Sequence, residues 1–594
     1  MNYGKSRPKL GLTFLPALLL ALSFTNSQAQ DNDPLCSAEF ARMIVEQQAS
    51  ELNLNTEKPK KVRILIAVAD FLWDLDQPAA RKYFAEARRT AIEFREELKS
   101  KPKSNDSGFN PEPDYEMTVI SAIAKRDPKW AEAIFREILN KAVDDKGTNS
   151  DDDLTFLRLN ALLSIASANA GTNPDLSLKL FRLAIANFRL DNPWVYALFD
   201  AAKQNRAVAN LAAIELLQKN SDADLSQLLY VSHFALGLPN GLGYSRPQIG
   251  ITIDENFTID PQVRDIFLNI FLSRAENYLS NPANITRQPG TNSFEIIAIY
   301  SALEALQPML PSLPAEIQRR VAIAKMRASS FMAKSDYDFL KNQQSRSFGR
   351  TIDQRIAALE AAEKENRLTD DEIVKAVFTA SGSVSELQGF QPWLEKIESE
   401  ETRTATYAYY WMLLTEAALK EDSLNEAERF AEKISRPVLR AAMMFKVAKA
   451  RLKDLNNLVD AYEILSRVSE ATRKAPDSAD KASVLIGLAN VYVDFNPSFA
   501  FSEFSDAVKA LNSSGPHRQI PGMTLLTIKT SKNSTYSISP GSPEFSLIAT
   551  VRKLSKTDLG LTLSNAKALD DPYLRAVAVI AAMGSCAEKQ KSSK

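Results

Sequence analysis

Hydrophobic residues recur along this chain at intervals of three and four, the spacing that places side chains on one face of an α-helix. The clearest example runs from Lys481 to Leu511, where an apolar stretch, an Asn-Pro pair and a second apolar stretch follow one another. This pattern predicts a helix, a short turn and a second helix that packs against the first. Because similar stretches fill most of the chain, we expect an all-α protein.

The same spacing of large and small apolar residues occurs in three separate places. The intervals in each copy are four, eleven, four and three, and the step of eleven crosses the turn. Ala or Ser at the crossing lets two helices approach closely, while Phe fills the space beside them. Such units predict an α-solenoid of stacked antiparallel helical hairpins. The residues of this repeat core are Leu65, Ala69, Ala80, Phe84 and Ala87; Leu162, Ala166, Ser177, Phe181 and Ala184; and Leu485, Ala489, Ala500, Phe504 and Ala507.

Asn-Pro and Asp-Pro pairs mark places where helices are expected to begin. An Asn or Asp side chain can accept a hydrogen bond from a free amide of the first turn. Proline suits the first helical position, where its missing N–H removes no hydrogen bond. The pairs are Asn173-Pro174, Asn496-Pro497, Asp127-Pro128, Asp260-Pro261, Asn281-Pro282 and Asp571-Pro572.

The pattern Ala80-x3-Phe84-x2-Ala87, which recurs from Ala500, resembles the second helix of tetratricopeptide repeats. The first helix lacks that family's Trp, its Leu-Gly pair and its Tyr, and the turn is one residue shorter. The chain therefore resembles a divergent tetratricopeptide-like (TPR-like) protein. The resemblance implies stacked hairpins and a groove for a peptide or protein, and it implies no catalytic residue.

Two irregular stretches interrupt the helical pattern. Residues 236–260 are rich in Gly and Pro and are expected to form a loop, which is our first choice for a binding surface because loops on rigid scaffolds often carry function. Residues 513–545 form a second insert, in which Thr-, Ile- and Leu-rich segments predict a β-hairpin near 524–539. We expect helical repeats over 30–235 and 261–512, further helices over 546–587 and a disordered tail over 588–594.

The N-terminus has the features of a secretory signal peptide. Basic residues precede an apolar run from Leu10 to Phe24, and Ser27-Gln28-Ala29 resembles a cleavage site. We expect residues 1–29 to be removed near Ala29 and the protein to be exported from a bacterial cell, to the periplasm or the medium. No second apolar segment is long enough to span a membrane, so we expect no transmembrane segment in the mature chain.

Cys36 and Cys586 are the only cysteines, and they lie near opposite ends of the mature chain. In an oxidising compartment such a pair often forms a disulfide. The bond would require the two Cα atoms to lie within about 7 Å, which an open solenoid does not allow. The sequence leaves both alternatives open, a disulfide or two unpaired thiols.

Composition and motifs argue against several classes of function. The chain has 72 basic and 73 acidic residues, so nothing in the charge balance indicates a nucleic-acid-binding surface. His233 and His517 are the only histidines, and a hydrolase triad, a His-x3-His zinc site or a Cys-His pair would each need more than this sequence shows. We find no nucleotide-binding motif and expect no catalytic residue, metal or cofactor.

Two functions therefore remain. The first is a non-enzymatic exported scaffold that mediates protein–protein or peptide interaction, with an unknown partner. The alternative is an all-α, toroid-type carbohydrate-active enzyme that uses paired carboxylates. Sequence spacing does not identify such a pair, because nearly every acidic residue also suits an exposed position on a helix.

Overall fold

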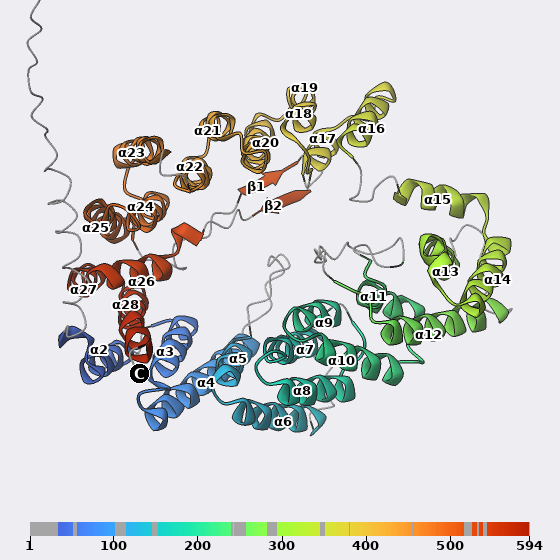
Figure 1. The fold of residues 1–594 in the computed structure, drawn as a ribbon, viewed down its shortest axis with the longest axis horizontal. Coiled ribbons are helices and arrows are strands. Elements are labelled where there is room, and N and C mark those ends of the chain that lie inside the picture. Colours follow the sequence, from blue (N-terminus) through green and yellow to red (C-terminus); the bar gives the residue numbers. More distant parts are fainter. Residues whose placement is uncertain are drawn as a thin grey trace, which may run out of the picture. The chain divides into compact units, whose positions relative to one another are not determined.

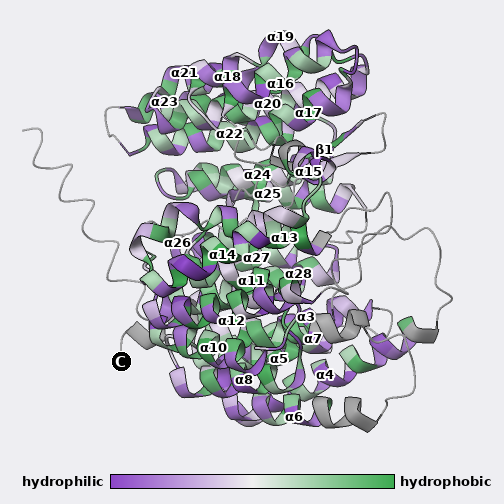
Figure 2. Ribbon diagram, turned by 90° about the vertical axis from the view of Figure 1, so that its right-hand side faces the viewer, coloured by the Kyte–Doolittle hydropathy of each residue, from purple (hydrophilic) through white to green (hydrophobic). Residues whose placement is uncertain are grey.

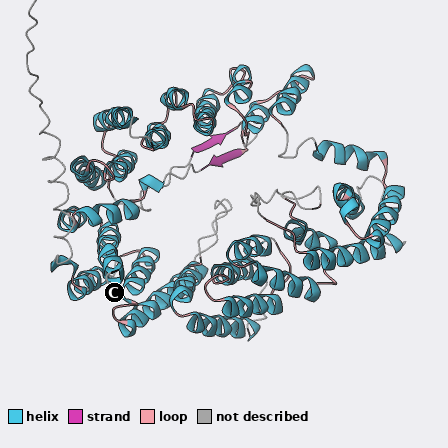
Figure 3. Ribbon diagram, in the orientation of Figure 1, coloured by secondary structure: helices cyan, strands magenta, loops and turns pink. Residues whose placement is uncertain are grey.

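The computed structural model describes residues 34–51, 56–100, 114–144, 152–191, 193–238, 242, 257–281, 294–344, 351–378, 380–453, 457–515, 526–530, 534–538 and 543–592. Over these residues the protein is mostly α-helical, with many consecutive helices packed in pairs and one small antiparallel sheet (Figures 1 and 3). The expectation of a predominantly helical protein is therefore confirmed. The predicted signal peptide at 1–29 lies outside the described residues.

Contacts divide the chain into two compact units. Residues 84–367 form one unit, here called the middle unit. Residues 1–83 and 368–594 together form the other, the terminal unit. The division falls within helix α4 (Gln77–Ser100), most of which belongs to the middle unit.

Helices of the middle unit pack against the next helix and also against the next but one. Helices α5, α7, α9, α11, α13 and α15 contact one another in that order, and α8, α10, α12 and α14 do the same. The consecutive helix pairs from α7–α8 to α13–α14 thus each contribute one helix to each of these two series. The bounds are α5 (Tyr115–Arg126), α6 (Pro128–Asp144), α7 (Asp152–Ala168), α8 (Pro174–Asn187), α9 (Pro193–Gln204), α10 (Arg206–Lys219), α11 (Leu225–Leu236), α12 (Pro261–Ser280), α13 (Phe294–Ala305), η3 (Gln307–Ser312), α14 (Ala315–Phe331), α15 (Lys334–Gln344) and α16 (Ile352–Lys364).

The terminal unit repeats this arrangement. Helices α20, α22, α24, α26 and α28 contact one another in order, and α21, α23, α25 and α27 pack against them. Helix α24 is buried on nearly every side, whereas α25 has one buried face. The bounds are η1 (Pro34–Cys36), α2 (Ala38–Ser50), α3 (Lys58–Leu72), α17 (Asp370–Val377), α18 (Val384–Gln388), α19 (Gln391–Leu394), α20 (Glu400–Lys420), α21 (Leu424–Glu432), α22 (Pro437–Arg451), α23 (Leu458–Lys474), α24 (Ala479–Tyr492), α25 (Pro497–Ser513), η5 (Pro543–Phe545), α26 (Leu547–Thr557), α27 (Leu559–Lys567) and α28 (Pro572–Ser592).

The first and last described helices meet inside the terminal unit. Helices α2 and α3 and the short helix η1 all pack against α28. The ammonium of Lys60 lies 5.9 Å from the ring centroid of Tyr573, and Arg575 lies 3.8 Å from Glu51. The first and last described helices therefore share one core.

The residues of the predicted repeat core are all buried. In the copy formed by α7 and α8, the hydroxyl of Ser177 donates a hydrogen bond of 2.6 Å to the carbonyl of Ala166 on the facing helix. The other two copies carry Ala80 and Ala500 at the same position. A small side chain thus lies at the crossing in each copy. Figure 2 shows hydrophobic and hydrophilic positions alternating along the helices.

The predicted helix caps are present at all but one of the Asn-Pro and Asp-Pro pairs. The side chains of Asn173 and Asn496 accept hydrogen bonds from the main-chain N–H three residues further on, at 3.2 and 3.3 Å. Asn281 is the exception: it ends α12, where its N–H donates to the carbonyl of Tyr278, and the residues that follow it lie outside the described part, so a helix start there stays a prediction. The remaining caps are Asp127, Asp260 and Asp571.

The predicted β-hairpin is confirmed. Strands β1 (Leu526–Lys529) and β2 (Thr535–Ile538) pair antiparallel, with Leu526 opposite Ile538. Strand β1 packs on α20, where the hydroxyl of Thr402 donates to the carbonyl of Lys529 at 2.7 Å. The hairpin is thus held against helices that precede it by more than a hundred residues.

Membrane-spanning segments are not found in the part of the chain that the structure describes. None of its helices combines enough length with enough apolar residues to cross a bilayer.

Candidate functional site

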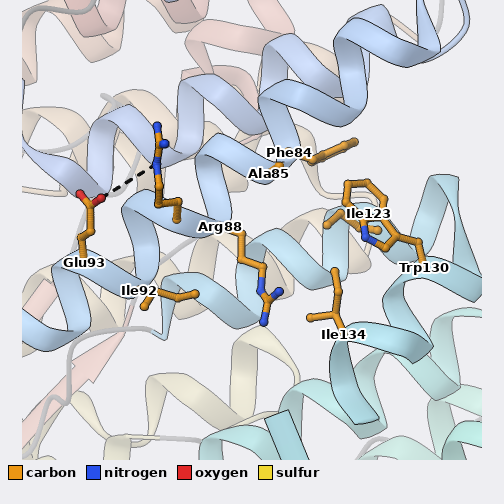
Figure 4. Close-up of a pocket in the computed structure, with 9 residues that line it drawn as sticks. Phe84, Ala85, Arg88, Ile92, Glu93, Ile123, Trp130 and Ile134 are labelled. Atoms are coloured by element: carbon orange, nitrogen blue, oxygen red, sulfur yellow. Dashed lines mark ion pairs between the residues drawn. The ribbon is translucent and has the colours of Figure 1, made fainter. Parts of the chain in front are cut away.

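A groove of about 380 Å³ lies on the middle unit, between three helices (Figure 4). Helix α4 supplies most of its lining, and α5 and α6 supply the rest. Six of the lining residues are apolar and the other three are charged. The lining residues are Phe84, Ala85, Arg88, Arg89, Ile92, Glu93, Ile123, Trp130 and Ile134.

The floor of the groove is built from core residues. Phe84 and Ile123 are completely buried, whereas Ile92 and Trp130 are only partly so. The rings of Phe84 and Trp130 meet edge to face, with centroids 6.3 Å apart and an interplanar angle of 76°. The groove therefore has an aromatic end whose floor is fixed by the helix packing.

The sequence explains why Trp130 lies there. Asp127 caps α6 by accepting a hydrogen bond of 3.0 Å from the N–H of Trp130, which fixes the start of that helix. On α4, Phe84, Arg88 and Ile92 are four residues apart and so share one face. The capped turn and this stripe bring the lining residues together.

Arg88 contributes the charge at the centre of the groove. Its Nε donates to Glu116 at 3.0 Å, and its Nη1 donates to Glu137 at 3.2 Å. Figure 4 shows the guanidinium between Ile92 and Ile134. The side chain of Arg88 is 19% exposed, so part of it faces solvent.

Glu116 holds two arginines at once. Its side chain is only 2% exposed and accepts hydrogen bonds from Arg88 and Arg95. Burial alone would lower the pKa of Arg95, but the nearby carboxylates of Glu116, Asp114 and Glu96 outweigh this effect and raise that pKa above its ordinary value. The orientation of Arg88 is fixed by its buried partner, Glu116.

The other end of the groove carries a solvent-exposed ion pair. Arg89 and Glu93 lie 4.0 Å apart, and their side chains are 71% and 52% exposed. An ion pair so exposed contributes little to stability, because water and salt screen it. Both side chains can rearrange around a ligand.

The arrangement around Arg88 suits binding. Arginine does not give up its proton at any physiological pH. The apolar floor offers a place for a hydrophobic side chain, and the guanidinium of Arg88 offers hydrogen-bond donors beside it. The groove can therefore select a ligand by shape, hydrophobicity and charge.

Most of the predicted site residues lie elsewhere. Of the repeat core, only Phe84 lines the groove. The loop at 236–260 falls largely outside the described residues, and at its end Phe257 packs against Phe199 and Phe234 with centroids 5.1 and 5.6 Å apart. Helix η1, which ends at Cys36, packs on α28, which carries Cys586. The side chain of Cys586 lies outside the described part, so the disulfide stays a prediction.

The histidines give no indication of a catalytic centre. His233 is buried near the end of α11, and its Nδ1 lies 3.1 Å from the carbonyl oxygen of Leu238. His517 lies outside the described residues. Within the described ranges, no three His, Cys, Asp or Glu side chains come together as a potential metal site.

Glu503, on α25, is an acidic residue in the core of the terminal unit. It is buried, and one oxygen accepts hydrogen bonds from Ser469 at 2.6 Å and Arg473 at 3.0 Å. The other oxygen, Oε2, is buried without a hydrogen-bond partner among the described residues. Burial raises the pKa of Glu503 above the usual range of a glutamate. Because its carboxylate is covered, it does not provide the accessible acid that a carbohydrate-active enzyme needs.

The residues that define the groove were not predicted from the sequence. Arg88 and Glu116 are 28 residues apart, and Arg88 and Glu137 are 49 apart. The stripe formed by Phe84, Arg88 and Ile92 was the available signal, since it places a cation within an apolar helix face.

Comparisons with known proteins identify no family. No protein-family model matches this chain, and no curated protein matches it in sequence.

Proposed function

We propose that this protein is an exported, non-enzymatic scaffold that binds a peptide segment of a partner protein in the groove between α4, α5 and α6. In this proposal the helix pairs form a TPR-like α-solenoid, and the protein works in the periplasm or outside the cell. The packing of each helix on the next and the next but one supports the solenoid. The signal-like N-terminus supports export.

The groove is the observation that carries the proposal. An apolar floor with an aromatic end, flanked by oriented charge, is the usual form of a site for a hydrophobic anchor residue. Phe84 and Ile123 are fixed in the core, so the site is formed before a ligand arrives. Such preorganisation lowers the entropic cost of binding.

Filling the groove tests the proposal. Ala85 is exposed and lines the groove on α4, so Ala85→Trp is expected to occupy the space without disturbing the core. Ala133 is also exposed, on α6, but does not line the groove, so Ala133→Trp is a matched control. Peptides are first selected from a displayed random library on the wild-type protein. Their affinities for the three proteins are then measured by fluorescence anisotropy.

We expect Ala85→Trp to weaken the binding of the selected peptides about tenfold or more, as expected when an anchor side chain is displaced. Ala133→Trp is expected to bind like the wild type. Equal binding by all three proteins, or a library that yields no binder, would contradict a peptide site in this groove.

A further inference from the structure

We infer that the groove selects acidic peptides. An apolar side chain of the peptide enters the groove, and a neighbouring carboxylate binds Arg88 in place of Glu137. This inference rests on the proposed function and adds the chemistry of the ligand to it. It is drawn from the charges and contacts around Arg88.

The first step is the charge excess at the groove. The charged residues that line the groove are Arg88, Arg89 and Glu93, a net charge of +1. Arg88 and Arg95 share the buried Glu116, and Arg95 has a second acidic neighbour in Glu96, at 3.6 Å. Glu137 balances the charge of the lining from the solvent side, through a contact of 3.2 Å to Nη1 of Arg88. Without Glu137 the lining would present this net positive charge to a ligand.

The second step is that the two glutamates hold Arg88 differently. Glu116 is 2% exposed, whereas the side chain of Glu137 is 45% exposed. A buried ion pair is costly to break, but an exposed pair contributes little because water replaces its partner readily. An incoming carboxylate therefore displaces Glu137 and leaves the contact with Glu116 intact.

The third step is the orientation of the guanidinium. Its Nε donates to the buried Glu116, whereas its Nη1 donates to the exposed Glu137, so the Nη side of the planar fork is the side that solvent reaches. Arginine can bind a carboxylate through two parallel hydrogen bonds, an interaction that is short and geometrically specific. In Figure 4 the guanidinium lies between Ile92 and Ile134, next to the apolar part of the groove. A peptide with a carboxylate next to an apolar anchor would contact the guanidinium and the apolar part of the groove together.

A selection experiment tests this chemistry. The full-length protein is used to select from a displayed library of peptides that have a fixed central leucine and randomised flanking positions. We expect Asp and Glu to be enriched beside the leucine. We also expect the binding of a selected peptide to weaken as salt is raised, because the ion pair with Arg88 is partly screened.

Substituting Glu137, which competes with the peptide for Arg88, gives a sharper test than substituting Arg88. Loss of Arg88 would remove one of the two arginines that pair with the buried Glu116. Glu137 is exposed, so the Glu137→Gln variant is expected to fold normally. We expect it to bind the selected acidic peptide about twofold to fivefold more tightly than the wild type, the gain appropriate to an exposed ion pair that no longer competes. Glu132→Gln is the control, because Glu132 pairs with Arg136 on the same helix and does not line the groove.

The outcomes separate this inference from the proposed function. Binders with an apolar anchor, lost on Ala85→Trp but without acidic enrichment, would overturn the inference and leave the peptide site standing. Unchanged or weaker binding by Glu137→Gln would also overturn it. No groove-dependent binder at all would contradict both.

Discussion

Gly487 shows how closely the helices of the terminal unit approach one another. It lies in the middle of α24, where glycine is normally unfavourable. A Cβ atom at this position would lie 2.4 Å from Cε2 of Phe445 and 2.9 Å from Cδ1 of Phe545. The two rings meet at 68°, with centroids 5.7 Å apart. Gly487 is needed because these rings occupy the space of a side chain.

We therefore predict that Gly487→Ala lowers the free energy of unfolding by about 1–3 kcal/mol, the usual cost of overpacking a core. Urea unfolding followed by circular dichroism measures the change.

Gly584 provides the control, since it also lies inside a helix, α28, but has no atom within 4 Å of the added methyl. Gly584→Ala is expected to be neutral or to stabilise by up to about 1 kcal/mol, because it restricts the unfolded chain. Equal effects of the two substitutions would show that the rings do not exclude a side chain at Gly487.

Glu503 predicts a pH dependence of stability. Its pKa is raised in the folded protein, mainly by burial, although Ser469 and Arg473 act in the opposite direction. The folded state therefore binds its proton more tightly than the unfolded state does. The stability from this group is fully present below the pKa of the unfolded chain, about 4.3, and is lost as the pH rises through the raised folded value.

Glu503→Gln replaces the acid with a neutral group, so it is expected to flatten the decrease in stability between about pH 4 and pH 7. The other groups that act on Glu503 remain unchanged in this variant; they are Ser469, Arg473 and Asp506. The measurement is the free energy of unfolding across this pH range. Glu463→Gln, at an exposed position of α23, is the control and should follow the wild type. The prediction fails if Glu503→Gln shows the same pH profile as the wild type.

At the scale of the helical hairpin, close packing of the two helices requires a small residue where they cross. Ser177 fills this position in the α7–α8 pair and also donates a hydrogen bond to Ala166. We predict that Ser177→Ala, which keeps the small size, costs about 1 kcal/mol for the lost hydrogen bond. Ser177→Leu is expected to cost about 1–3 kcal/mol or more through overpacking. Thermal and urea unfolding compare the two, and a well-tolerated leucine would show that close approach is not required.

Helices and their caps were the part of the structure that the sequence predicted best. The spacing of Leu162, Ala166 and Phe181 depends only on helix geometry and a short turn, so a local pattern was sufficient to identify buried positions. Caps such as Asn173 are local as well.

The candidate site was harder to predict because it depends on contacts between distant residues. Phe84 was predicted to be a core residue, and it is buried. That it also forms the floor of a groove depends on Trp130 and Ile134, which come from a different helix pair. The contact between Arg88 and Glu116 likewise depends on how α4 and α5 pack, and no spacing rule specifies that.

At the scale of the whole molecule, the packing of α2 and α3 on α28 is the least local feature. The terminal unit is therefore completed only after α28 is made. The division between Tyr83 and Phe84, inside one helix, has no counterpart in composition or in turn residues.

The contact between η1 and α28 leads us to predict that Cys36 and Cys586 are joined in the exported protein. Peptide mapping by mass spectrometry without reductant is expected to find the two cysteine-containing peptides linked, and separate after reduction. Two free thiols in an intact, oxidised sample would contradict the prediction and would mean that helix packing alone holds the chain ends together.

The most direct test of the central claim is hydrogen–deuterium exchange of the full-length protein with and without a selected peptide. A ligand in the proposed groove excludes water from α4, α5 and α6 and stabilises their amides against exchange. We predict that slowed exchange is concentrated in Phe84–Glu93 and in the helical segments around Ile123 and Trp130. Protection confined to another part of the chain, or no protection at a saturating peptide concentration, would contradict the account.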